Sequence, residues 1–227
     1  MTQRYELKTI QTIQTINQLL DSGTNKISVL LRHSARYFSD DARLEPFMGL
    51  TDTGKQFAMD FGALLPPKLS LKLSSSFMGR CIETSYLIDK GFTKKNNLFL
   101  EPNCIHETLS PFYIKDIERT IQQIETEGND TFLRNWFDHC IDDDIIEHPE
   151  KTATLLTQFM IEQIKPLKEN QIAVCVSHDW NLFPVKEFKL GLKHEEYGNV
   201  GYLEGIVFFE KENHYYITNH QAAPQIL

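Results

Sequence analysis

The sequence has no long apolar run, no excess of basic residues and no closely spaced cysteines. No stretch of about 18 or more apolar residues is present, which argues against a transmembrane helix. The polar residues 1–8 lack the apolar centre of a secretory signal. The formal net charge of −8 argues against a general nucleic-acid binder, because such proteins carry a basic face. We therefore expect a cytoplasmic protein that binds neither membranes nor nucleic acid.

The cysteines give no sign of a metal or redox site. The four of them, Cys81, Cys104, Cys140 and Cys175, lack the paired spacing that zinc or redox chemistry needs. Cys175 falls in a predicted buried strand and Cys81 on a helix face, where cysteine behaves as a small hydrophobe. We expect neither a metal ion nor a cofactor. Hydrophobic residues make up 41% of the 227 residues, which is enough for a sizeable core.

Helical and strand-like apolar patterns alternate along the chain. Helical spacing covers residues 4–21, 51–65, 79–90 (closed by Gly91) and 149–165, and it resumes near Leu182. Short apolar runs at 26–31, 70–75, 98–100 and 171–177 predict buried strands, and 205–209 with 215–218 predict a hairpin. This order predicts an α/β fold, with helices on both faces of a mostly parallel sheet and an antiparallel hairpin at one edge.

Residues 102–147 form a long aromatic and acidic insertion. Unstructured connections of this length are uncommon in compact domains, so we interpret the segment as a lid or cap within one domain that spans residues 1–227. It contains a predicted amphipathic helix near 115–127 and a shorter one near 132–137. The run Asp142-Asp143-Asp144 suggests either a cation site or a solvated loop, and we favour the loop.

Arginine and histidine side chains follow three of the predicted strands. These residues are Arg32, His33 and Arg36 after the first strand, Arg80 after the second, and His178 with Asp179 after the strand at 171–177. Ligands of open α/β sheets bind outside the carboxyl ends of the parallel strands, so we expect all six residues to face one crevice. The alternative, three unrelated polar surface loops, does not explain why these residues follow apolar strands directly.

These residue types suit phosphoryl transfer. Arginine binds phosphate oxygens bidentately and stays charged, and a neutral imidazole is a good nucleophile near neutral pH. A leaving alkoxide needs a proton, which Asp179 beside His178 is placed to deliver. Other carboxylates stay open as donors: Glu83, Glu101 and Glu107. Two structural roles compete with this assignment, an Asp179 helix cap and an ion pair of Arg32 with Asp40 or Asp41.

In these motifs the chain resembles the histidine phosphatase superfamily, which has the phosphoglycerate-mutase-like fold. The matching elements are Arg32-His33-Ser34-Ala35-Arg36, Leu50-Thr51-Asp52-Thr53-Gly54, the set Ser76, Arg80 and Thr84, and His178-Asp179, in the family's order. The resemblance implies that His33 is the nucleophile. It also implies that Arg32, Arg36, Arg80 and His178 bind the phosphate and that Asp179 donates the proton, as in the acid-phosphatase branch.

The resemblance predicts a metal-independent phosphomonoesterase that acts on a small phosphorylated metabolite through a phosphohistidine. Ser34 stands where the family usually has glycine, which leaves open a catalytically weak protein that only binds phospho-ligands. A phosphoglycerate-type mutase is less favoured, because the His-Asp element belongs to the other branch. We expect residues 102–147 to set substrate choice, together with Tyr37, Phe38, Phe47 and Met48. Their aromatic content suggests a leaving group with apolar surface.

Overall fold

The computed structural model describes residues 2–96 and 102–227. The described strands form one seven-stranded sheet in the order β3-β2-β4-β1-β5-β6-β7. They are β1 (Lys26–Arg32), β2 (Ser70–Ser75), β3 (Cys104–Ile105), β4 (Gln171–Ser177), β5 (Gly205–Lys211), β6 (His214–Asn219) and β7 (Ala222–Ile226). The first four strands of the sheet order run parallel, and β5, β6 and β7 continue it in antiparallel pairing. The predicted α/β class is therefore confirmed.

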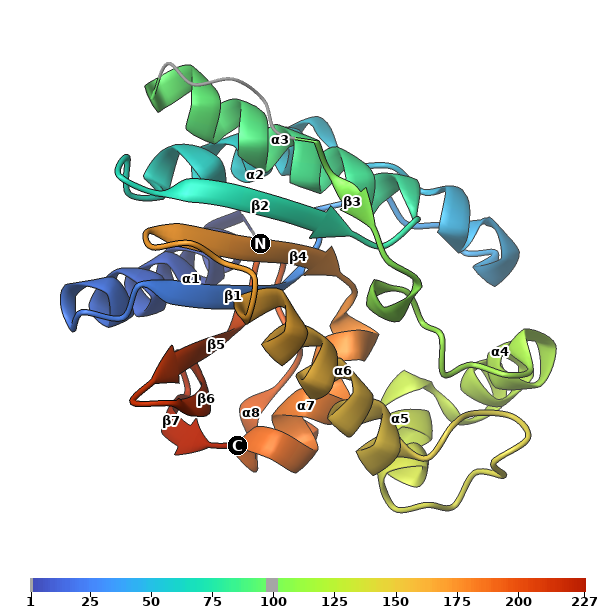
Figure 1. The fold of residues 1–227 in the computed structure, drawn as a ribbon. Coiled ribbons are helices and arrows are strands. Elements are labelled where there is room, and N and C mark those ends of the chain that lie inside the picture. Colours follow the sequence, from blue (N-terminus) through green and yellow to red (C-terminus); the bar gives the residue numbers. More distant parts are fainter. Residues whose placement is uncertain (1, 97–101) are drawn as a thin grey trace.

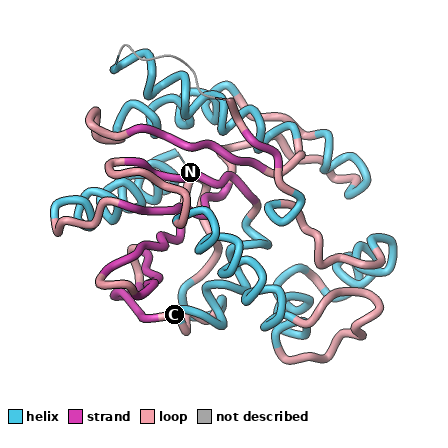
Figure 2. The backbone as a smooth tube through the Cα atoms, viewed as in Figure 1, coloured by secondary structure: helices cyan, strands magenta, loops and turns pink. Residues whose placement is uncertain are grey.

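Helices cover both faces of the sheet (Figures 1 and 2). One face is covered by α1 (Thr2–Asp21), α2 (Asp52–Leu64) and α3 (Gly79–Asn96), and the other by α5 (Asn129–Phe137), α6 (Pro149–Ile164) and α7 (Asp179–Leu190). Alternation along β1 explains the two cores, because Val29 and Leu31 pack on the first side and Leu30 on the second. The short α8 (His194–Tyr197) follows α7.

The segment 102–147 carries β3, the 3₁₀ helix η2 (Glu107–Leu109), α4 (Ile117–Glu127) and α5. In Figure 1, α4 and α5 lie beyond the ends of the parallel strands, on the side where β2 and β4 end. A second 3₁₀ helix, η1 (Ala42–Phe47), shares a groove with α4. The loop before α6 is solvated, and its Asp144 pairs with Arg119 at 2.7 Å on the surface.

The end of α3 differs from the prediction, because the helix continues through Gly91 to Asn96. A Cβ atom at Gly91 would lie 2.0 Å from the carbonyl oxygen of Met59, and one at Gly62 would lie 1.9 Å from that of Ile88. These glycines let the backbones of α2 and α3 touch, so Gly91 is a packing residue and not a helix terminator.

Other elements also differ from the sequence prediction. The helix α7 begins at Asp179 rather than near Leu182, so Pro184 lies inside it. The strand β7 was not predicted, and the predicted strand at 98–100 lies outside the described residues. No helix within the described ranges is long and apolar enough to cross a membrane.

Candidate active site

His33 lies immediately after β1, where the backbones of two parallel strands hold it. Its N–H donates to the carbonyl of Ser177 at 2.9 Å, and its side chain is buried. The ring Nδ1 lies 2.8 Å from the carbonyl oxygen of Ser34. A carbonyl only accepts, so Nδ1 carries the proton and Nε2 keeps its lone pair. Burial, and then the positive charge of Arg32, lowers the pKa of His33 well below its usual value. The ring is therefore neutral near pH 7.

The loop after His33 is fixed by its contacts with α2 and α3. Ser34 donates its hydroxyl to the carbonyl of Gly54 at 2.6 Å, and its N–H donates to the Thr84 hydroxyl at 3.1 Å. A Cβ atom at Gly54 would lie 1.9 Å from the carbonyl oxygen of Ala35, so the start of α2 can approach the loop only with glycine there. Serine therefore fits at this position of the loop, and its hydroxyl joins the loop to α2.

The three arginines of the predicted phosphate pocket are each held by a carboxylate or a carbonyl. Arg32 pairs with Asp179 at 2.7 Å and donates to the carbonyl of Val200 at 2.6 Å. Arg36 forms an ion pair with Glu45. Arg80 donates to the backbone carbonyl of Glu45 at 3.0 Å. Glu45, which lies in η1, thus orients two of the arginines.

Each of these arginines also presents a buried donor without an acceptor. The Nε atoms of Arg32, Arg36 and Arg80 are buried and have no hydrogen-bond partner among the residues the structure describes. Buried N–H groups are nearly always paired, and leaving one unpaired costs about 1–3 kcal/mol. All three arginines line the same cavity. The arrangement suits an anion that accepts several hydrogen bonds at once.

His178 lies beside His33, with the two ring centroids 5.5 Å apart. Its Nδ1 lies 3.4 Å from Nη2 of Arg80, and because a guanidinium only donates, Nδ1 is the acceptor. The other nitrogen, Nε2, then donates to the Ser76 hydroxyl at 3.0 Å. Burial, and then the charge of Arg80, lowers the pKa of His178 to about 3. His178 is neutral and orients the Arg80 side chain.

Asp179 is the first residue of α7, and the cap position itself belongs to His178. One carboxylate oxygen of Asp179 accepts from the N–H of Trp180 at 2.9 Å, and the other pairs with Arg32. The Asp179 side chain is 29% exposed and lines the cavity, so it is accessible to a bound ligand. Arg32 therefore pairs with Asp179, and not with Asp40 or Asp41, the alternative partners named from the sequence.

The other candidate proton donors lie elsewhere. Glu83 is directed toward Lys55, 3.9 Å away, and Glu107 is exposed. Neither is among the described residues that line the cavity. Glu101 lies outside the described residues. Of the named carboxylates that the structure describes, Asp179 is the one at the cavity wall.

One cavity of about 780 Å³ brings five of the six predicted residues together. Its lining includes Arg32, Arg36, Arg80, His178 and Asp179. His33 is not among the described residues that line the cavity, but its ring lies next to two that do, with ring centroids 5.5 Å from His178 and 5.9 Å from Tyr202. Sequence reasoning missed Glu45 and Tyr202. Tyr202, whose ring lies 4.2 Å from Cζ of Arg32, belongs to no motif, and Glu45 lies in an irregular stretch without periodicity.

No protein-family model matches the sequence, and no curated protein sequence matches it. Several solved structures are similar in fold. A mycobacterial glucosyl-3-phosphoglycerate phosphatase has a TM-score of 0.56 and 13% identity, over 89% of this chain and 97% of that chain. Phosphoglycerate mutase from Bacillus anthracis has a TM-score of 0.52 and 14% identity, over 87% of this chain and 94% of that chain. A phosphoserine phosphatase from Entamoeba histolytica has a TM-score of 0.50 and 14% identity, over 85% of this chain and 95% of that chain. The chain therefore has the phosphoglycerate-mutase-like fold that its motifs predicted.

Proposed function

We propose that the protein is a histidine phosphatase that hydrolyses a small phosphorylated metabolite through a phosphohistidine at His33. One observation carries the proposal. A buried neutral imidazole with a free Nε2 lies near Arg32 and Arg80, beside a cavity that Arg36 also lines, and the Nε donors of all three arginines have no partner in the described residues. A phosphomonoester dianion supplies the acceptors that these donors lack, and its phosphorus is the electrophile that Nε2 needs.

The reaction runs in two steps. In the first, Nε2 of His33 attacks phosphorus, an N–P bond forms, and the ester P–O bond breaks as Asp179 gives its proton to the leaving oxygen. The bound phosphate takes over Arg32 from the Asp179 side chain, which leaves that carboxyl free to face the leaving oxygen. In the second step, water gives a proton to Asp179 and attacks phosphorus, which releases phosphate and restores His33.

Charge neutralisation in this scheme comes from side chains alone. Arg32, Arg36 and Arg80 carry three positive charges into the cavity, against the carboxylates of Asp179 and Glu45. Planar guanidinium groups match the equatorial oxygens of a transferring phosphoryl group, which is the role that metal ions have in many other phosphotransfer enzymes. We therefore propose that turnover needs no added metal.

The fold comparisons support a phosphatase. Two of the three similar structures described above are phosphatases, and the mycobacterial enzyme has also been solved in complex with inorganic phosphate. The hydrogen bonds of Ser34 favour an intact nucleophile loop over a protein that only binds phospho-ligands. We also place the protein in the cytoplasm, because all four cysteines are free and persist as thiols in a reducing compartment.

The test is hydrolysis of an aryl phosphate in the presence of a chelator. The wild-type protein is expected to turn over, and His33→Ala is expected to lose activity while it still binds phosphate or vanadate. His214→Ala, at an exposed histidine in β6, is the matched control and retains activity. Activity that survives His33→Ala contradicts the proposal. Tight vanadate binding without hydrolysis of any ester in a broad panel favours the binding-only alternative.

A further inference from the structure

The apolar face of α4 lines the cavity, and its Ile124 also packs against the second core. Ile117, Ile121 and Ile124 follow helical spacing, and all three line the cavity. Such a face normally packs against the core of a globular protein. Here Thr120 is the one buried residue of the described helix, and Ile117 is 56% exposed. The isoleucine face therefore has room to cover a ligand.

Apolar side chains from other elements also line the cavity. Trp180 and Phe183 come from α7, and Phe38 comes from the loop before η1. Trp180 is held in place by stacking on Phe132, with ring centroids 5.6 Å apart. Since Trp180 directly follows Asp179, this part of the lining continues from the candidate proton donor. The leaving group of a bound phosphoester would lie on this side.

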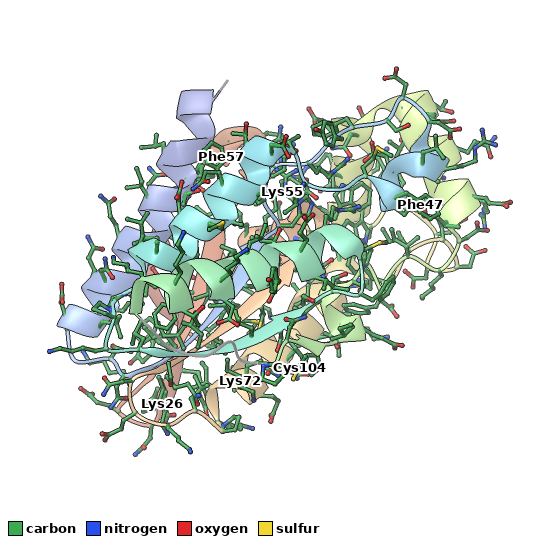
Figure 3. The ribbon with its side chains drawn as sticks, turned by 90° about the horizontal axis from the view of Figure 1, so that it is seen from above. Lys26, Phe47, Lys55, Phe57, Lys72 and Cys104 are labelled. Atoms are coloured by element: carbon green, nitrogen blue, oxygen red, sulfur yellow. The ribbon has the colours of Figure 1, made fainter. Side chains whose placement is uncertain are left out.

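The aromatic residues that the sequence pointed to are mostly used elsewhere. Phe47, labelled on η1 in Figure 3, is 79% exposed, and it is not among the described residues that line the cavity. Tyr113 and Trp136 of the segment 102–147 are buried in the core. The segment thus presents mainly aliphatic side chains to the cavity, which offer dispersion contacts, with Thr120 and Asn129 as its polar lining residues.

We infer that the substrate is a phosphomonoester with a bulky apolar leaving group, an alkyl or aryl moiety that the isoleucine face of α4 covers. The inference rests on the proposed function for the phosphate end of the same cavity. A volume of about 780 Å³ is in the range of pockets that hold drug-sized ligands, and it exceeds the needs of phosphate alone. A compact polar leaving group would leave the apolar walls in contact with water, without a gain in affinity.

Binding of n-alkylphosphonates from methyl to octyl tests the inference, because these phosphate mimics cannot be hydrolysed. Isothermal titration calorimetry gives the dissociation constant for each chain length. Each buried methylene contributes about 0.8 kcal/mol, so affinity is expected to rise about fourfold per carbon until the cavity is filled. The double variant Ile117→Asn/Ile121→Asn is expected to reduce this slope strongly. The same change at Ile226, 62% exposed on β7, is the control and leaves the slope unchanged.

The outcomes separate the inference from the proposed function. Affinity that is independent of chain length overturns the inference, and the proposed function stands if aryl phosphates are still hydrolysed. Chain-length dependence without hydrolysis of any ester supports the apolar site and overturns the phosphatase. A slope that is unchanged in the double variant also overturns the inference, because the isoleucine face would then not contact the chain. If no phosphonate binds at any length, the inference is overturned, and hydrolysis of aryl phosphates alone decides the proposed function.

Discussion

Asp179→Asn separates proton donation from phosphate binding. Asparagine keeps the shape of the side chain and a carbonyl oxygen for the Trp180 N–H, but it has no acidic proton. General acid catalysis contributes about 10²- to 10⁴-fold, which is about 2.7 to 5.4 kcal/mol of transition-state stabilisation. We expect kcat/KM for alkyl phosphates to fall by about this factor. Aryl phosphates, whose leaving groups barely need a proton, should lose less than about tenfold.

The same substitution should strengthen phosphate binding. Asp179 holds Arg32 at 2.7 Å in the free protein and places a negative charge beside the anion site. A partly exposed pair of this kind is worth about 1 kcal/mol, so phosphate should bind about fivefold more tightly to the variant. Competitive inhibition by inorganic phosphate measures this change. A variant that merely unfolds would lose phosphate affinity.

Asp52→Asn is the matched control for Asp179→Asn. Asp52, like Asp179, is an acidic residue in the first turn of a helix, but it lies on the surface at 94% side-chain exposure. Its loss should leave kcat/KM unchanged for both ester types. Equal losses of kcat/KM on alkyl and aryl phosphates in Asp179→Asn would refute the proton-donor role. They would shift that role to another carboxylate.

Three further predictions concern the scaffold of the site. Gly54→Ala should destabilise the fold by about 1–3 kcal/mol and abolish most activity, because its Cβ would overlap the carbonyl of Ala35. The control is Gly79→Ala, where a Cβ meets no atom within 4 Å, and it should change neither stability nor activity. Ser34→Gly removes the buried hydrogen bond from the Ser34 hydroxyl to the carbonyl of Gly54. The free energy of unfolding, measured by urea titration, should therefore fall by about 1–2 kcal/mol, and kcat/KM should fall less than about tenfold. The pKa of His178 is about 3 in the fold and about 6.5 when unfolded, so the unfolded chain binds the extra proton between these values. The contribution of His178 to the free energy of unfolding is complete above pH 6.5 and is lost as the pH falls, by about 2 kcal/mol between pH 7 and pH 5. An unfolding free energy that stays constant over this range would contradict the prediction.

The central sheet and the phosphate end of the cavity could be predicted because short-range patterns encode them. Apolar runs located β1, β2 and β4, and the residues after these strands had to meet at one edge of a parallel sheet. The proximity of Arg32, Arg80 and His178 therefore follows from sequence order and strand direction alone.

Other features depend on contacts between segments far apart in the sequence. Gly91 looks like a helix terminator locally, and only the approach of α2 explains why the helix continues. Glu45 orients Arg36 and Arg80 from a 3₁₀ helix that has no apolar periodicity. The isoleucine periodicity of α4 predicted a helix but could not say whether its apolar face meets the core or a cavity. Such outcomes are set by tertiary packing, which a local pattern does not contain.

The most direct test of the account is to trap the covalent intermediate. Asp179→Asn should form the phosphoenzyme from an aryl phosphate, yet its asparagine cannot take the proton of the attacking water, so the intermediate should accumulate. Rapid quenching followed by tandem mass spectrometry locates the phosphoryl group. The account predicts close to one phosphoryl group per chain, on the imidazole of His33, and none in the double variant His33→Ala/Asp179→Asn. A phosphoryl group on another residue, or hydrolysis without any phosphoenzyme in the first turnover, would contradict it.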